Sequence, residues 1–115
     1  MPVMTFAVPL LPGKTEAWKQ ALGEITGSRH REYGESRRRM GISREVVSLQ
    51  ETPQGDYVVV FLEADDPGSV VGRYLESDAP FDKWFADTIL KGTHGLDASQ
   101  PPPPTNQVYL DWQAD

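Results

Sequence analysis

The sequence predicts an α+β fold in which one four-stranded antiparallel sheet carries helices on a single face. Segments with strand and helix patterns follow one another in the order strand, long helix, strand, strand, helical segment, strand. The chain has 115 residues, the length of one ordinary domain and too few for two cores. This βαββαβ order is that of the ferredoxin-like, or split βαβ, architecture, and we expect one such domain over residues 1–115.

The first predicted strand, residues 3–10, shows side chains of two sizes in alternation. Met4 and Phe6 belong to the large set, and Thr5 and Ala7 to the small set. Either set could face the helices, and a small set facing inward would leave room for a ligand. The alternation therefore predicts a strand but leaves its orientation open.

A helical segment follows over residues 15–40, where apolar side chains recur near helical spacing. Gly27 and Gly34 lie within it, and each weakens a helix by about 1 kcal/mol relative to alanine. We therefore expect a kink or break near Gly27 and Ser28. Gly41 is the expected stop signal at the end of the segment.

Two strands joined by a hairpin at residues 52–56 (Thr-Pro-Gln-Gly-Asp) come next. The even-numbered positions of the segment 57–64 are all apolar, so this face must lie against the helices. The odd-numbered face is apolar as well, with polar groups at Tyr57 and Glu63.

Helical signals resume at Pro67 and again at Pro80, and Gly92 closes the second of these segments. A proline-rich strap over residues 97–106 then leads to the last predicted strand. This strand, residues 108–112, is expected because apolar and polar side chains alternate along it.

Composition excludes several classes of function. The formal net charge of −6 argues against nucleic-acid binding. The chain lacks cysteine, a signal-peptide pattern and the run of about 20 apolar residues that a membrane span needs, so a cytoplasmic protein without membrane association is expected. The two histidines lack metal-motif spacing, and we expect no metal site and no cofactor. The arginine run 37–39 is either an anion-binding patch or a solvated helix face.

The predicted sheet implies a partner because helices cover only one of its faces. The other face carries Val46, Val59 and Phe61, an apolar patch that monomers rarely expose. We therefore expect a homodimer in which the two open sheet faces meet.

Several stretches resemble the dimeric α/β-barrel superfamily, and in particular uncharacterised bacterial domains of that architecture. The resemblance covers nearly the whole chain and is most specific over residues 44–67; it also includes the stretches 31–42, 49–53 and 80–85 and the pair His94-Gly95. The superfamily includes small-molecule monooxygenases, haem-degrading enzymes, lactone isomerases and ligand-sensing domains. The resemblance therefore implies a small-molecule ligand but selects no reaction.

Two residues are candidates for acid–base chemistry. His94 follows a helix end and could titrate near neutrality at the mouth of a cavity, or it could interact with the terminal helix carbonyls. Glu63 ends an apolar strand face, where burial would raise its pKa, or it could lie in solvent or pair with Arg44.

Five further residues are candidates for ligand binding because they bring polar or aromatic groups to the sheet: Arg44, Gln50, Tyr57, Phe61 and Tyr109. One hypothesis is a homodimer that binds a small organic molecule and performs cofactor-free proton transfer or monooxygenase-type chemistry. The alternative is a non-catalytic module for ligand sensing or dimerisation.

Overall fold

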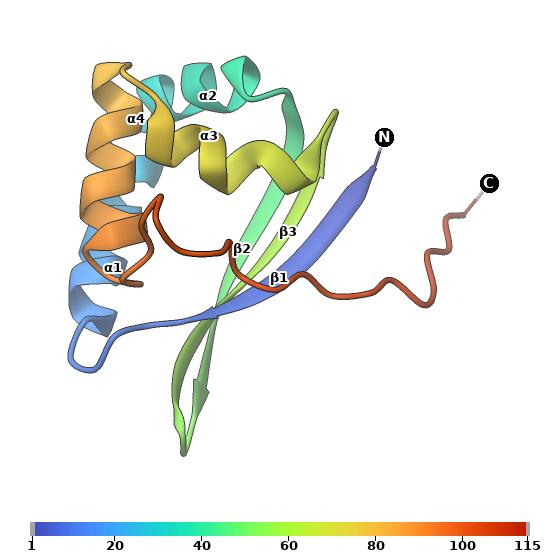
Figure 1. The fold of residues 1–115 in the computed structure, drawn as a ribbon, viewed down its shortest axis with the longest axis horizontal. Helices are drawn as coiled ribbons and strands as arrows, with labels where there is room; N and C mark the ends of the chain where they lie inside the picture. Colours follow the sequence, from blue (N-terminus) through green and yellow to red (C-terminus); the bar gives the residue numbers. More distant parts are fainter. Residues whose placement is uncertain (1, 115) are drawn as a thin grey trace.

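The computed structural model describes residues 2–114 and shows an α+β fold in which helices cover one face of a three-stranded antiparallel sheet (Figure 1). The strands are β1 (Val3–Pro9), β2 (Ile42–Thr52) and β3 (Gly55–Ala64). β3 lies in the centre, in the order β1-β3-β2, so β1 and β2 are both edge strands.

The helical layer contains elements from both halves of the chain (Figure 1). Its members are α1 (Thr15–Thr26), α2 (His30–Arg39), the 3₁₀ turn η1 (Pro67–Ser69), α3 (Val70–Glu76), α4 (Pro80–Phe85) and the π-helical η2 (Ala86–Lys91). η2 continues α4 without interruption, so the two form one rod beside α1 and α2.

Strand alternation places the core as the sequence predicts. Val58 and Val60 of β3 are buried beneath the helices, which confirms the expected orientation of the even-numbered face. Phe6 pairs with Val60 and Val8 with Val58, and both are buried. The large set of β1 therefore faces the helices and the small set faces outward. This decides between the two orientations of the first strand that the sequence left open.

Two glycines act at the positions expected of them. The segment 15–40 breaks after Thr26, as predicted, and the following Gly27 leaves no room for a side chain because a Cβ there would lie 2.9 Å from the carbonyl oxygen of Gly23. Gly41 follows α2 with a φ of +73°, a left-handed conformation that favours glycine. The hairpin is confirmed too, since β2 ends at Thr52 and β3 begins at Gly55.

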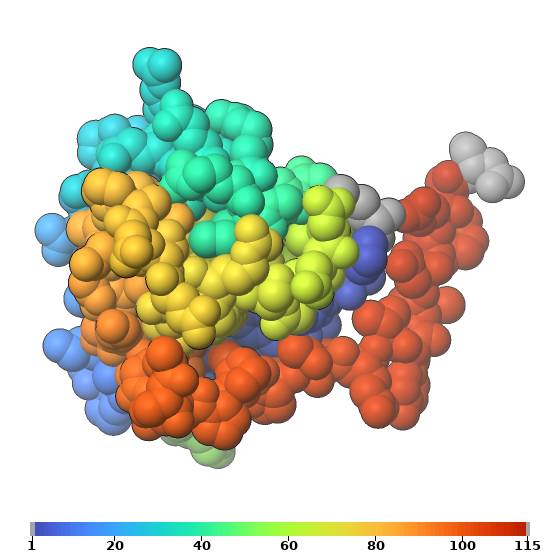
Figure 2. All heavy atoms as spheres, turned by 45° about the horizontal axis from the view of Figure 1, so that its top comes forward, coloured from blue at the N-terminus to red at the C-terminus, as the bar shows by residue number. Residues whose placement is uncertain are grey.

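The prediction of a four-stranded βαββαβ fold is wrong. The element order within residues 2–114 is β-α-α-β-β-α-α, and the last segment, residues 101–114, contains no strand. Instead, the strap leads to an extended tail that leaves the body of the molecule (Figures 1 and 2). We refer to residues 106–114 as the C-terminal tail.

Strand pairing fails because the tail reaches β1 at a single place. The backbone N–H of Asn106 donates to the carbonyl oxygen of Thr5 at 2.8 Å, and the side-chain amide of Asn106 donates to the hydroxyl of Thr5 at 3.1 Å. The preceding four prolines have no N–H to offer a strand partner. Beyond Asn106 the side chains of Tyr109 and Leu110 are 91% and 85% exposed. The alternation of side chains in the tail is compatible with an extended chain, but in the described part of the chain no neighbouring strand forms a ladder of hydrogen bonds with it.

Candidate functional site

A partly enclosed cavity of about 80 Å³ lies between the helix-facing side of the sheet and the helical layer. Side chains from all three strands, from α1, α2, α3, α4 and η2, and from the segment after η2 form its wall, and most of them are aliphatic or aromatic. The groups that can carry charge in this wall are Arg37, Glu45 and His94. The cavity is therefore an apolar space with a few polar groups, the usual character of a small-molecule site.

Arg37 of α2 and Glu45 of β2 form a buried ion pair in the cavity wall. The Nε of Arg37 donates to Oε1 of Glu45 at 2.7 Å, and Nη2 donates to Oε2 at 3.2 Å. The side chains are only 10% and 12% exposed. The hydroxyl of Tyr33 also donates to Oε1 of Glu45. One carboxylate thus accepts hydrogen bonds from two residues of α2.

Three aromatic rings enclose the guanidinium group of Arg37. Its central carbon lies 4.2 Å from the ring centre of Tyr33, 4.7 Å from that of Phe85 and 4.9 Å from that of Tyr74. Burial by itself lowers the pKa of Arg37, but the nearby Glu45 carboxylate favours the cation and the net shift is upward. For Tyr33, by contrast, burial is the main effect and it raises the pKa of the phenol. At neutral pH the cluster therefore holds one cation, one anion and a protonated phenol.

One donor of this cluster has no acceptor. Within residues 2–114, the Nη1 atom of Arg37 is the sole buried side-chain nitrogen or oxygen without a hydrogen-bond partner. Buried polar groups are almost always paired, so an unpaired donor marks a place where a partner is expected. Other atoms of the Arg37 side chain line the cavity, whereas Nη1 itself is enclosed by its neighbours.

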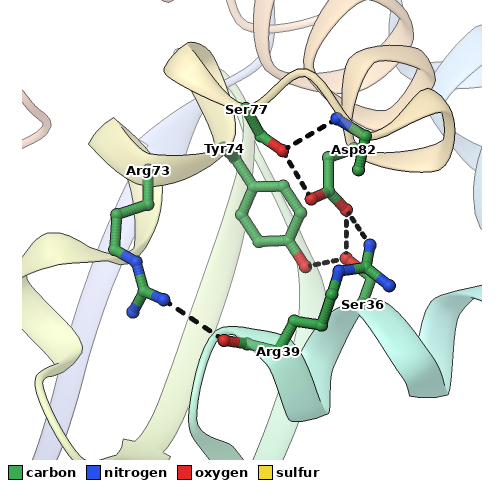
Figure 3. Close-up of polar contacts among 7 residues, drawn as sticks. Ser36, Arg39, Arg73, Tyr74, Ser77 and Asp82 are labelled. Atoms are coloured by element: carbon green, nitrogen blue, oxygen red, sulfur yellow. Dashed lines mark hydrogen bonds and ion pairs between the residues drawn. The ribbon is translucent and has the colours of Figure 1, made fainter.

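A second polar network lies next to this cluster and connects α2, α3 and α4 (Figure 3). Ser36 donates to Oδ1 of Asp82 at 2.6 Å, so the hydroxyl of Tyr74, 2.5 Å away, donates to Ser36. Asp82 also accepts hydrogen bonds from Arg39 at 2.9 Å and from Ser77 at 2.7 Å. Asp82 is 1% exposed.

This network fixes the position of Arg37. Ser36 precedes Arg37 on α2, and the Tyr74 ring contacts the Arg37 guanidinium while its hydroxyl bonds to Ser36. From α3, Arg73 donates to the carbonyl oxygens of Arg39 and Met40 at the end of α2 (Figure 3 shows the first of these). The arginine run 37–39 is thus neither a simple anion-binding patch nor a simple solvated face: Arg37 is buried, Arg38 is exposed and Arg39 pairs with Asp82.

His94, one of the two residues predicted for acid–base chemistry, follows η2 and lies in the cavity wall. Its Nδ1 is 2.9 Å from the carbonyl oxygen of Pro9. Because a carbonyl only accepts, Nδ1 carries the proton, and in the neutral ring Nε2 has a free lone pair. Burial lowers the pKa of His94, although the bond to Pro9 opposes the shift. The imidazole is therefore neutral at pH 7 and can accept a proton.

The remaining predicted residues do not lie in this cavity. Period-two alternation places one group of them on the open face of the sheet, opposite the helices: Arg44, Gln50, Tyr57, Phe61 and Glu63. Tyr109 lies in the exposed tail. The structure therefore separates the two acid–base candidates, with His94 on the helical side of the sheet and Glu63 on the other.

Glu63 lies at one end of the open face. Ser43 donates to its Oε1 at 2.8 Å. Arg44 is opposite Glu63 in the sheet register, and its guanidinium lies 5.8 Å from the ring centre of Phe61. The open face thus carries an apolar centre, with Arg44 and Glu63 at one end and Gln50 at the other.

Sequence reasoning missed Tyr33, Arg37 and Glu45 as a site. The signals were present in the spacing: Tyr33 and Arg37 are four residues apart on one helix face, and Glu45 has the same strand phase as the core residue Val47. A charged residue in each of two core-facing positions indicates a buried ion pair.

No helix in residues 2–114 is long and apolar enough to cross a membrane. The same part of the chain contains no group of three or more histidine, aspartate or glutamate side chains placed to hold a metal ion. The chain matches no protein-family model and no curated protein. The cavity and its polar cluster are therefore the observations on which a function must rest.

Proposed function

We propose that this protein binds a small, mostly apolar organic molecule in the cavity between the sheet and the helices. The observation that carries this proposal is the cavity itself. A space of about 80 Å³ in a core costs about 2 kcal/mol if it stays empty. A larger core side chain would remove that cost, so an apolar space that the core leaves unfilled favours use by a ligand.

A substitution that fills the cavity tests this proposal. Val47 lines the cavity from the edge strand β2, and phenylalanine there would occupy the space. Binding of methylenecyclopentane, an uncharged hydrocarbon, is followed by ¹H–¹⁵N NMR through the indole signal of Trp18, another lining residue. We expect shifts in the natural protein and in the control Gln20→Phe, which adds a ring on the exposed side of α1. Loss of the shifts in Val47→Phe supports the site; equal shifts in Val47→Phe, or none in the natural protein, contradict it.

Proton transfer without a cofactor is the second candidate function, and the state of His94 favours it. A neutral imidazole with its lone pair on Nε2 is a general base at pH 7. Exchange of the acidic carbon-bound protons of nitroethane in D₂O, followed by NMR, tests this activity. Catalysed exchange that falls in His94→Gln supports a base; exchange no faster than with free imidazole favours the non-catalytic, ligand-sensing alternative.

We also propose that two copies of the chain meet through the open sheet face, in the cytoplasm. Val46 is 43% exposed at the centre of this face, next to the half-buried Phe61, and helices do not cover it. Arg44 and Glu63 at one end could pair with the same residues of a second copy across a two-fold axis. Native mass spectrometry measures the subunit number, and a strictly monomeric protein at micromolar concentration would contradict the proposal.

A further inference from the structure

We infer that the cavity selects an uncharged carbonyl compound, whose oxygen accepts a hydrogen bond from Nη1 of Arg37. This inference rests on the proposed function, since it names the chemical class of the ligand for the same cavity. It depends on three observations: the unpaired donor, the charge balance of the cavity wall and the size of the space.

The donor requires an acceptor oxygen. Nε and Nη2 of Arg37 are both bound to Glu45, whereas Nη1 has no partner within residues 2–114. A buried donor left unpaired costs about 1–3 kcal/mol, and more when it is charged. A pure hydrocarbon would leave this cost in place. A ligand with an acceptor on an otherwise apolar body removes this cost once the rings that enclose the guanidinium move aside, and it still fits the apolar wall.

The charge balance excludes an anionic ligand. Glu45 already neutralises Arg37, so the pair has no net charge. His94 is the one other group in the wall that could be positive, and it is neutral at pH 7. A carboxylate in this space would add a buried charge without a counterion, which is strongly unfavourable. A ketone, aldehyde or ester oxygen accepts the same hydrogen bond without this penalty.

The space limits the size of the ligand and indicates how it enters. About 80 Å³ holds a body of a few heavy atoms. A wider groove between α1, α2 and β2 shares six lining residues with the cavity: Leu22, Ile25, Tyr33, Arg37, Glu45 and Val47. These side chains form the partition between the two spaces. A ligand that entered from the groove would have to cross this partition, which contains the Tyr33–Glu45 hydrogen bond and Arg37.

Three probes of similar shape separate the outcomes: cyclopentanone, methylenecyclopentane and cyclopentanecarboxylate. Each is titrated into the natural protein by ¹H–¹⁵N NMR, and the carbonyl stretch of bound cyclopentanone is recorded by infrared spectroscopy. We expect the ketone to bind about tenfold or more tightly than the other two, as expected for one hydrogen bond to a charged donor. We also expect its carbonyl stretch to move to lower frequency on binding.

Removal of the donor is the matched test. The triple variant Tyr33→Phe, Arg37→Met, Glu45→Met replaces the whole polar cluster, so no buried charge is left unpaired. In this variant the ketone should lose its advantage and its infrared shift while the hydrocarbon still binds. Arg31→Met, which removes a 93% exposed arginine from the same helix, should leave the preference for the ketone unchanged.

The outcomes distinguish this inference from the proposed function. Equal binding of ketone and hydrocarbon overturns the inference and leaves the cavity proposal intact. Preference for the carboxylate overturns the inference in favour of an anion site. Failure of all three probes to bind overturns both.

Discussion

Replacement of Arg37 by methionine should destabilise the protein severely, because it leaves the Glu45 carboxylate without its cation. Glu45 is 12% exposed and would lose two of its three hydrogen bonds, keeping the one from Tyr33. Removal of one partner of a buried ion pair costs about 3–5 kcal/mol, a large part of the roughly 5–15 kcal/mol by which a domain is stable. We therefore expect a fall in Tm of about 10–20 °C.

Removal of both charges should be far milder. In the double variant Arg37→Met, Glu45→Met, two apolar side chains replace the pair, and such exchanges are often neutral or stabilising. The free energy of unfolding is measured by urea denaturation with tryptophan fluorescence and circular dichroism. Arg31→Met is the control, since its ion pair with Glu35 is exposed and contributes little.

Two results of these measurements would contradict the prediction. If Arg37→Met lies within about 1 kcal/mol of the natural protein, Glu45 is solvated and the buried pair is not a feature of the fold. If the double variant is as unstable as the sum of the two single variants, the charges are not coupled. Either result would remove the charge-balance argument on which the preference for an uncharged ligand depends.

Three further predictions concern other parts of the chain. Asp82→Ala should lower the free energy of unfolding by about 3 kcal/mol or more, because three donors to a carboxylate that is 1% exposed lose their acceptor; a loss below about 1 kcal/mol in urea denaturation would contradict this. Gly41→Ala should cost about 1–2 kcal/mol from its left-handed conformation, whereas the Asp65 carboxylate oxygen, 2.9 Å from an added Cβ, can move aside at little cost; a Tm equal to that of the natural protein would refute the strain. Because burial lowers the pKa of His94 in the folded state, the unfolded chain binds a proton at higher pH, so this residue makes stability fall as the pH drops below the ordinary value of 6.5. Urea denaturation on both sides of that pH should show a weaker decline in His94→Gln, and an unchanged decline would exclude the effect.

The strands and the core were predictable because they depend on local patterns. Period-two alternation in β3 placed Val58 and Val60 beneath the helices, and the Pro53-Gln54 turn was identified from composition. The break at Gly27 followed from the low helix propensity of glycine. Each of these features is determined by residues close together in the sequence.

The fourth strand could not be predicted in the same way, because pairing depends on where the chain travels in space. The alternation around Tyr109 describes an extended backbone, and extended chains are as compatible with a free tail as with a sheet. The four-proline strap determines the path by which the chain reaches β1, and a single backbone hydrogen bond from Asn106 is the result. No local pattern reports whether a backbone donor finds an acceptor on a distant strand.

The polar cluster around Arg37 was missed for a related reason. The arginines at 37–39 are consecutive in the sequence and look like one charged group, but consecutive helical residues point about 100° apart. Arg37 therefore enters the core, Arg38 faces solvent and Arg39 reaches Asp82. His94 was identified because its position after a helix end is a local feature. Its partner Pro9 lies 85 residues earlier and is visible only in the fold.

The two polar clusters around α2 form one assembly that connects the helices and contributes to the cavity wall. Ser36 and Arg37 are neighbours, and Tyr74 contacts both, by a hydrogen bond to the first and by its ring to the second. The Asp82 network is fully paired, so it holds α2, α3 and α4 in fixed positions (Figure 3). The Arg37 cluster depends on that rigidity and is the one that retains an unpaired donor. In the part of the chain that the structure describes, the Asp82 network leaves no buried group unpaired, whereas the Arg37 cluster leaves Nη1 unpaired, and under the proposed function this donor is the group that a ligand would satisfy.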